Sequence, residues 1–176
     1  GGSPTLINVT ISGNYAANGG GAIGIYGNAQ SDAAIVNSIL WGNSPQEIYL
    51  SNNQTTPSSV SIEYTNIQNG QDSIVTNDNG TVTWGDGNID VDPMFVDTAN
   101  GNYHLLASSQ LINAGHPDST DSDGTVADMG AYPYLNNYSG PTWYIAASGN
   151  DTTATGSSGD PFRSIQAGIN FSSDTD

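Results

Sequence analysis

The chain has 176 residues, of which 10 % are charged. It carries 17 acidic side chains and one basic side chain, for a formal net charge of −16. So acidic a surface cannot replace the counterions of a nucleic acid or bind an anionic membrane surface. The absence of cysteine excludes disulfides, thiolate zinc sites and a cysteine nucleophile. No apolar run approaches the roughly 20 residues that span a bilayer. A composition rich in Asn, Thr and Gly and free of Lys favours an extracellular or cell-surface protein.

A short segment recurs along the first 80 residues. The sequence Leu-Ile-Asn-Val-Thr-Ile-Ser-Gly-Asn at 6–14 returns as Ile-Val-Asn-Ser-Ile-Leu-Trp-Gly-Asn at 35–43 and, in a more divergent form, at 61–70. In this alignment Ile11 occupies the same position as Leu40. Each copy is a short β-branched strand that ends at Gly or Asn, and this pattern is typical of a strand followed by a tight turn.

These repeats predict an all-β chain wound in stacked turns. Equivalent residues of a solenoid lie about 4.8 Å apart in one column, so similar strands must recur one turn apart, whereas a sandwich has no such requirement. We therefore expect a solenoid in preference to a sandwich or a propeller. Ile11, Leu40 and Ile67 should share one column. Asparagines at matching corners should form side-chain ladders, the alternative being that they are unrelated turn residues.

The pattern changes after residue 80, where bulky side chains alternate with Gly, Asp and Pro in chain without regular periodicity. The open end of a solenoid exposes an apolar layer that must be covered. We therefore predict that residues 81–136 form an irregular cap. The bulky residues available for it include Trp84, Phe95, Tyr103, Leu105, Leu106, Leu111 and Ile112.

The run Gly-Asn-Ile-Asp-Val-Asp-Pro-Met-Phe-Val-Asp at 87–97, with 102–105, 109–115 and 127–132, carries a resemblance to a known family. It resembles the carboxy-terminal region of bacterial secreted right-handed parallel β-helix proteins, of the pectate-lyase-like superfamily with a surface-anchor or sorting tail. The resemblance covers about residues 3–134. It implies that the repeats are the last coils of a right-handed parallel β-helix.

Two later segments, 143–151 and 159–169, look like the opening of such a β-helix, where a first strand and a short capping helix close the amino-terminal end. An ending followed by a beginning implies either tandem β-helix modules or a piece cut from a longer polypeptide. The expected organisation is coils over 1–80, an irregular cap over 81–136, a linker over 137–142 and the start of a second β-helix module over 143–176.

The densest group of carboxylates consists of Asp118, Asp121, Asp123 and Asp128. Carboxylates so close together repel one another unless a cation lies among them, and Gly124 allows the loop to wrap around an ion. The sequence therefore predicts a calcium site here, although its spacing differs from that of an EF-hand. The alternative is a solvated acidic loop.

Two further candidate sites are less well defined. Asp86, Asp90 and Asp92 form a sparser acidic cluster that is a second candidate for calcium. Trp41 and Trp84 are candidates for stacking on sugar rings, although aromatic residues at corners usually serve packing.

The sequence offers little machinery for catalysis. A uronate lyase needs a cationic base, for which Arg163 is the sole candidate, and the net charge would repel a polyanionic substrate. The imidazoles of His104 and His116 have no serine elbow to accompany them. We therefore expect a non-catalytic structural or adhesive module that occurs in tandem or assembles head to tail. The alternatives are a polysaccharide-active enzyme fragment, with paired carboxylates for hydrolysis, and a carbohydrate-binding module.

Overall fold

The computed structural model describes residues 2–26, 30–52 and 56–172. The chain is mostly β-strand and divides into two compact units. The first comprises Gly1–Val91 with Met129–Ala131, and the second comprises Asp92–Asp128 with Tyr132–Asp176. No helix in the described part of the chain is long and apolar enough to cross a membrane.

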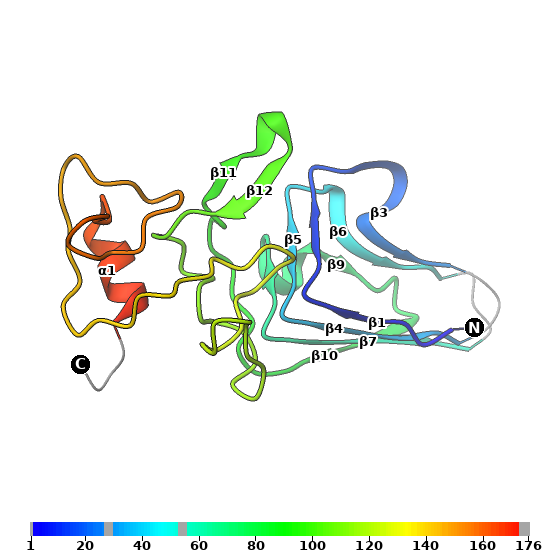
Figure 1. Cartoon of the computed structure of the whole chain (residues 1–176). Coiled ribbons are helices and arrows are strands. Elements are labelled where there is room, and N and C mark those ends of the chain that lie inside the picture. Colours follow the sequence, from blue (N-terminus) through cyan, green and yellow to red (C-terminus); the bar gives the residue numbers. More distant parts are fainter. Residues whose placement is uncertain (1, 27–29, 53–55, 173–176) are drawn as a thin grey trace. The chain divides into compact units, whose positions relative to one another are not determined.

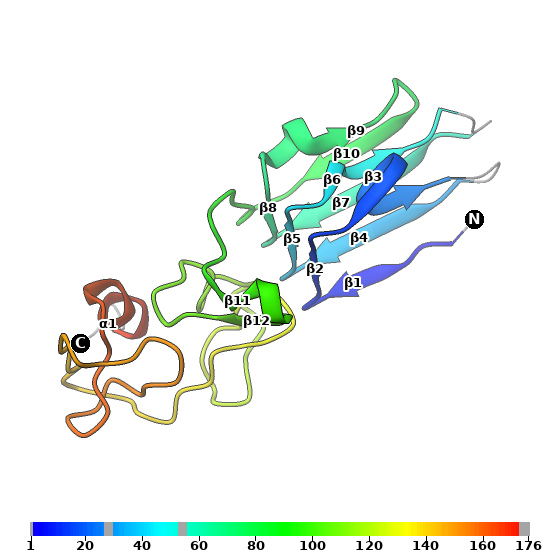
Figure 2. The ribbon, with the colours of Figure 1, turned by 90° about the horizontal axis from the view of Figure 1, so that it is seen from above.

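The first unit contains three parallel sheets, which the chain visits in turn (Figures 1 and 2). Sheet A contains β1 (Thr5–Ile7), β4 (Asp32–Val36), β7 (Ser58–Glu63) and β10 (Gly80–Trp84) in that order. Sheet B contains β2 (Thr10–Ser12), β5 (Ile39–Trp41) and β8 (Asn66–Ile67). Sheet C contains β3 (Tyr15–Ile25), β6 (Ser44–Leu50) and β9 (Ile74–Val75), the last preceded by the 3₁₀ helix η1 (Gly70–Ser73). Each of three successive passages therefore adds one strand to each sheet, and β10 adds a fourth strand to sheet A.

Equivalent residues of successive turns lie side by side, as the repeat predicts. Ile11 pairs with Leu40 and Leu40 pairs with Ile67, so the expected column is confirmed. Sheet A shows the same arrangement in the row Leu6, Ile35, Ile62 and Trp84. Parallel pairing thus brings the similar residues of each turn together.

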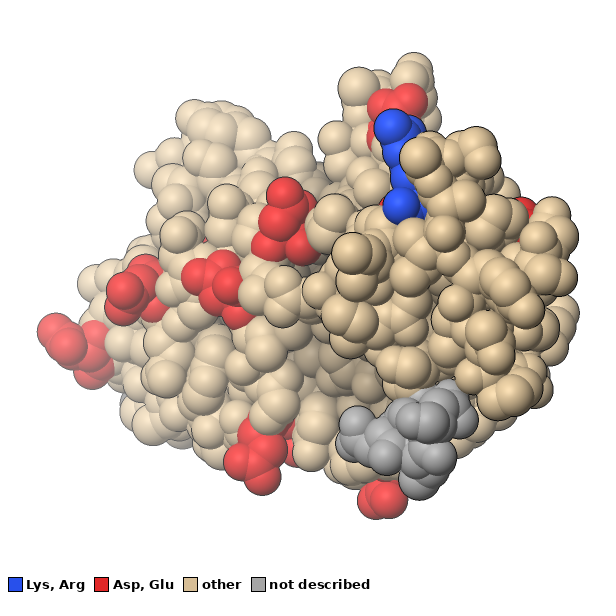
Figure 3. Space-filling model, turned by 90° about the vertical axis from the view of Figure 1, so that its left-hand side faces the viewer, with Lys and Arg blue, Asp and Glu red and all other residues tan. Residues whose placement is uncertain are grey.

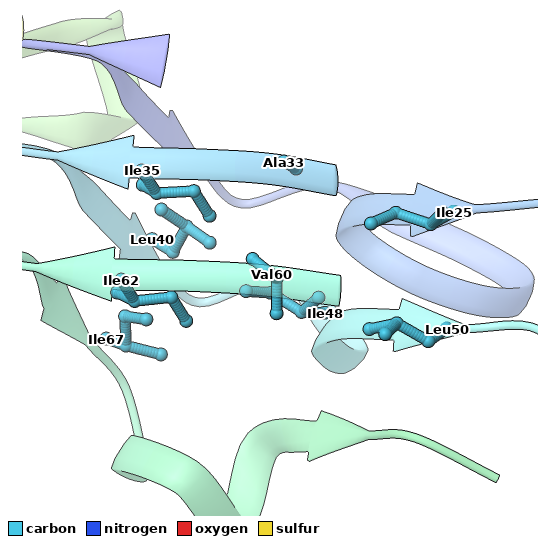
Figure 4. Close-up of a cluster of buried hydrophobic side chains, with 9 residues drawn as sticks. All are labelled: Ile25, Ala33, Ile35, Leu40, Ile48, Leu50, Val60, Ile62 and Ile67. Carbon is cyan, nitrogen blue, oxygen red and sulfur yellow. The ribbon is translucent and has the colours of Figure 1, made fainter. Parts of the chain in front are cut away.

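The core of the first unit lies between the sheets (Figure 4). Alternation along β4 buries Ala33 and Ile35, while Ala34 and Val36 are partly exposed, as expected for a strand with one buried face. Leu40, which comes from sheet B, is fully buried in the same cluster. The buried members of this cluster are Ile25, Ala33, Ile35, Leu40, Ile48, Leu50, Val60, Ile62 and Ile67.

A column of side-chain oxygens stabilises the corner between sheets A and B. The backbone N–H of Val9 donates to Ser38 Oγ (3.1 Å). In the next turn the N–H of Ser38 donates to Thr65 Oγ1 (3.4 Å), and in the following one the N–H of Thr65 donates to Asn88 Oδ1 (3.0 Å). A side-chain oxygen of each turn therefore accepts a backbone N–H of the turn before it. Without this acceptor the N–H would be unpaired, because the corner has no neighbouring strand to pair with it.

The corner after sheet B carries the predicted asparagine ladder. Asn14 Nδ2 and the Asn14 N–H both donate to Asn43 Oδ1, each at 2.9 Å. Asn43 Nδ2 in turn donates to the carbonyl of Ile11 (2.8 Å). The ladder is therefore confirmed for this pair of turns.

The second unit is largely irregular. It contains a hairpin of β11 (Phe95–Asp97) and β12 (Asn102–Leu105) around the 3₁₀ helix η2 (Thr98–Asn100), and one α-helix, α1 (Ile165–Phe171). Ser164 Oγ accepts the N–H of Ala167 (3.2 Å) and caps α1, so the short helix expected in this region is present.

Segments that the sequence analysis assigned to different modules share one core in the second unit. Ala107, from the expected cap, is fully buried with Ala154, Phe162 and Ala167, from the expected second module. Asn170 Nδ2 also donates to the carbonyl of Ala107 (2.9 Å). The structure thus packs these two segments together in a single compact unit.

Truncating the shared column should destabilise the first unit. We expect Leu40→Ala to lower the free energy of unfolding by about 2–5 kcal/mol, because it removes a fully buried side chain between two neighbouring turns. Ile7→Ala is the matched control, since Ile7 is 56 % exposed and should matter little. Urea unfolding measures both, and equal losses would contradict the prediction.

Candidate functional site

Asp128 is the buried centre of the acidic loop. It is 3 % exposed, and its two carboxylate oxygens accept backbone N–H groups from distant positions. Oδ1 accepts from Asn113 and Oδ2 from Tyr134, both at 2.7 Å. Asp128 therefore connects two irregular segments that share no backbone hydrogen bonds of a β-sheet with each other.

Asp121 and Asp123 extend this network. Asp121 Oδ2 accepts the N–H of Asp128 (2.8 Å). Asp123 Oδ2 accepts the N–H of Asn136 (2.8 Å), and its Oδ1 accepts the hydroxyl of Thr125 (2.7 Å). Three of the four predicted calcium ligands thus accept backbone N–H groups, whereas the side chain of the fourth, Asp118, is exposed.

Burial and hydrogen bonding act in opposite directions on these carboxylates. Burial raises the pKa of Asp128 to about 7, against the effect of its two backbone donors and with a smaller contribution from the charges of Asp121 and Asp123. Burial also raises the pKa of Asp121. Burial opposes ionisation of Asp123 as well, yet the donors Asn136 and Thr125 together lower its pKa.

No group of three or more His, Cys, Asp or Glu that could hold a metal ion occurs among the residues that the structure describes. The carboxylates of the acidic loop instead face backbone N–H groups, which are the partners that an anion finds without a cation. In the second predicted cluster Asp86, Asp90 and Asp92 are all exposed. Calcium binding at either cluster stays a prediction.

The two tryptophans proposed for sugar contact occupy structural positions. Trp84 ends β10 and packs against the core of the first unit. Trp41 ends β5, is half-buried and pairs in register with Ser12. Sugar binding by either ring stays a prediction.

Glu47 is a buried carboxylate that the sequence analysis did not single out. It is 2 % exposed, and it accepts the N–H (3.1 Å) and Nδ2 (2.7 Å) of Asn43. Burial raises its pKa. Glu47 also lines a cleft of about 310 Å³ together with Asn69 and Asp72. In the sequence, only the position of Glu47 in the strand that follows the Asn43 corner could have suggested that it is buried and bonded to Asn43.

The first turn leaves one edge of every sheet without a neighbouring strand among the described residues, because β1, β2 and β3 each stand at the end of their sheet. Ala34 N donates to Pro4 O (2.9 Å) and Asn8 N donates to Val36 O (3.2 Å), so even-numbered residues of β1 face β4. By alternation the backbone groups of Thr5 and Ile7 point away from the sheet.

An apolar hollow of about 290 Å³ lies beside these edges. Its lining includes Leu6, Ile23, Ile25 and Ala33, and none of the residues that line it is charged. We call β1, β2, β3 and this hollow the open end of the first unit. It combines the outward backbone groups of β1 with an apolar hollow, which are features of a surface that accepts another strand.

The chain matches no known protein family, no curated protein and no solved structure. The resemblance to the pectate-lyase-like superfamily therefore stays a prediction from the sequence.

The buried Asp128 should make stability depend on pH. Its folded pKa of about 7 lies above the ordinary value of 3.8, so the folded state binds the proton more tightly and its contribution to stability is lost as pH rises from about 4 to about 7. Thermal unfolding in metal-free buffer should show a larger loss over this range for the wild type than for Asp128→Asn, which cannot titrate. Equal slopes would contradict the assignment.

The calcium prediction is tested by chelation. If the ion binds at the acidic loop, a chelator should lower the melting temperature, and Asp121→Asn with Asp123→Asn should remove the difference. Asp78→Asn, an exposed position outside both clusters, is the control. Identical wild-type melting curves with calcium and with chelator would exclude the site.

Proposed function

We propose that the chain is a non-catalytic extracellular structural or adhesive module built on coils of a right-handed parallel β-helix, and that it assembles head to tail or occurs in tandem. The sheet order supports this proposal, since strands of successive turns pair in parallel in all three sheets. Parallel pairing needs a long crossover between neighbouring strands, and here each crossover runs through the two other sheets.

The observation that carries the proposal is the open end. The outward N–H and C=O groups of β1 are satisfied when a further parallel strand, from a second copy or a tandem module, pairs with its edge, and the same event covers the apolar hollow. The composition is consistent with a non-catalytic role, because Arg163 is the only Lys or Arg available as the cationic base of a lyase.

Self-association should depend on the β1 edge. We expect the mass measured by light scattering to rise with protein concentration, and Ile7→Pro to weaken this rise, because proline removes an outward N–H and places a ring at the edge. Ile7→Thr, which keeps the N–H, is the control. A monomer at every concentration and calcium level would contradict head-to-tail assembly.

One observation favours a second candidate, a polysaccharide-active enzyme. Glu47 is a buried carboxyl with a raised pKa in a cleft that Asp72 also lines, and a glycoside hydrolase needs a protonated acid beside a second carboxylate. Turnover of a polysaccharide that Glu47→Gln abolishes would favour this candidate. Activity that survives in Glu47→Gln would exclude the cleft as its origin.

A further inference from the structure

The peptide bond between Asp160 and Pro161 joins an exposed acidic residue to the segment that contains α1. Bonds between Asp and Pro are sensitive to acid for two chemical reasons. The carboxylate can reach the carbonyl carbon of its own residue and close a five-membered ring, so it is an intramolecular nucleophile. The proline nitrogen is bonded to three carbon atoms and has no N–H, so it is more basic than an ordinary peptide nitrogen and leaves more readily once it is protonated.

The fold holds both reacting groups of Asp160 in place. Asp160 Oδ2 accepts the N–H of Thr155 (2.9 Å), and the Asp160 carbonyl accepts the N–H of Gly156 (2.9 Å). Because Thr155 and Gly156 are consecutive, their N–H groups hold the carboxylate and the carbonyl of one residue close together. No described residue donates a hydrogen bond to Oδ1, so this oxygen is available for attack.

The Gly156 N–H lies at the atom on which negative charge develops. When the carboxylate adds to the carbonyl carbon, the carbonyl oxygen becomes an oxyanion, and a backbone donor that is already bonded to it stabilises this charge. Gly156 has a φ of +77°, and a Cβ there would overlap the ring of Phe162, so the position requires glycine. Phe162 is fully buried, and its packing therefore fixes the donor beside the Asp160 carbonyl.

The other Asp-Pro bond of the chain, between Asp92 and Pro93, lacks this arrangement. Asp92 is exposed, as Asp160 is, but Asp92 Oδ1 accepts the N–H of Met94, which lies beyond the proline (2.9 Å). No residue that the structure describes donates a hydrogen bond to the Asp92 carbonyl. The two bonds are therefore chemically alike and differ in what surrounds them in the fold.

We infer that the folded chain cleaves its own backbone between Asp160 and Pro161. Asp160 Oδ1 bonds to the carbonyl carbon of the same residue, the C–N bond to Pro161 breaks, and the proline nitrogen takes a proton from solvent. Water then opens the cyclic anhydride that remains on Asp160. The products are a chain that ends in the two carboxylates of Asp160 and a segment that begins with the amino group of Pro161. This reaction goes beyond the proposed function and does not depend on assembly.

The cleaved segment should stay bound until the chain unfolds. The N–H of the buried Phe162 donates to the carbonyl of Tyr144 (2.9 Å), and the Arg163 N–H donates to Asp151 Oδ1 (2.8 Å). Arg163, the only basic residue of the chain, is exposed two positions beyond Pro161, and Figure 3 shows this single cationic side chain at the surface. Solvent therefore reaches this part of the chain, while the packing of Phe162 holds the two products together.

The test compares the two Asp-Pro bonds in the whole chain. One sample is kept in mildly acidic buffer, in which circular dichroism shows the chain to be folded, and a second is kept in the same buffer with urea. Mass spectrometry in denaturant measures the cuts after Asp160 and after Asp92. In the folded chain the cut after Asp160 should be faster by about tenfold or more than the cut after Asp92, and faster than the same cut in urea. Equal rates in either comparison overturn the inference.

Two variants assign the chemistry. Asp160→Glu enlarges the ring that must close, and Pro161→Ala replaces the leaving nitrogen with that of an ordinary peptide bond, so each should slow the cut by about tenfold or more. Asp92→Glu is the matched control and should leave the cut after Asp160 unchanged. Wild-type rates in Asp160→Glu overturn the inference. Native mass spectrometry of the cleaved wild type should show one species that is heavier than the intact chain by one water molecule.

Discussion

The hydrogen bonds between strands of successive turns determine most of the architecture of the first unit. Because they run between parallel strands, a residue in one turn faces its equivalent in the next, and like side chains meet along columns such as Ile11, Leu40 and Ile67. The apolar core, the asparagine ladder and the column of side-chain oxygens all follow from that one arrangement. The same bonds place β1, β2 and β3 at the edges of their sheets among the described residues.

The regular part of the fold could be predicted because backbone register converts sequence repetition into contact. The Leu40 column and the pairing of Asn14 with Asn43 both follow from alignment of the repeats. The path of β3 could not be predicted. Its register with β6 shifts between Tyr15 and Gly20, where the chain bulges through glycines, and a Cβ at Gly20 would overlap the carbonyl of Ile23. Glycines permit such a path without indicating which one is taken.

The acidic loop shows a different limit of sequence reasoning. Mutual repulsion of carboxylates suggested a cation, yet the structure places Asp128 against the backbone donors of Asn113 and Tyr134. Main-chain N–H groups are present at nearly every position, so no sequence pattern reports which of them will meet a carboxylate. The packing of Ala107 with Phe162 was hidden for a related reason, because irregular chain has no period from which long-range contacts can be read.

The oxygen column at the first corner has an implication for how such a chain can change. Ser38, Thr65 and Asn88 are three different residues, and each accepts the same kind of backbone N–H from the preceding turn. The position demands a short side chain with an acceptor, and several amino acids meet that demand. Neighbouring turns can therefore differ in residue identity while their stacking is preserved. A chain of parallel stacked strands can thus keep its architecture when its repeats are no longer similar in sequence.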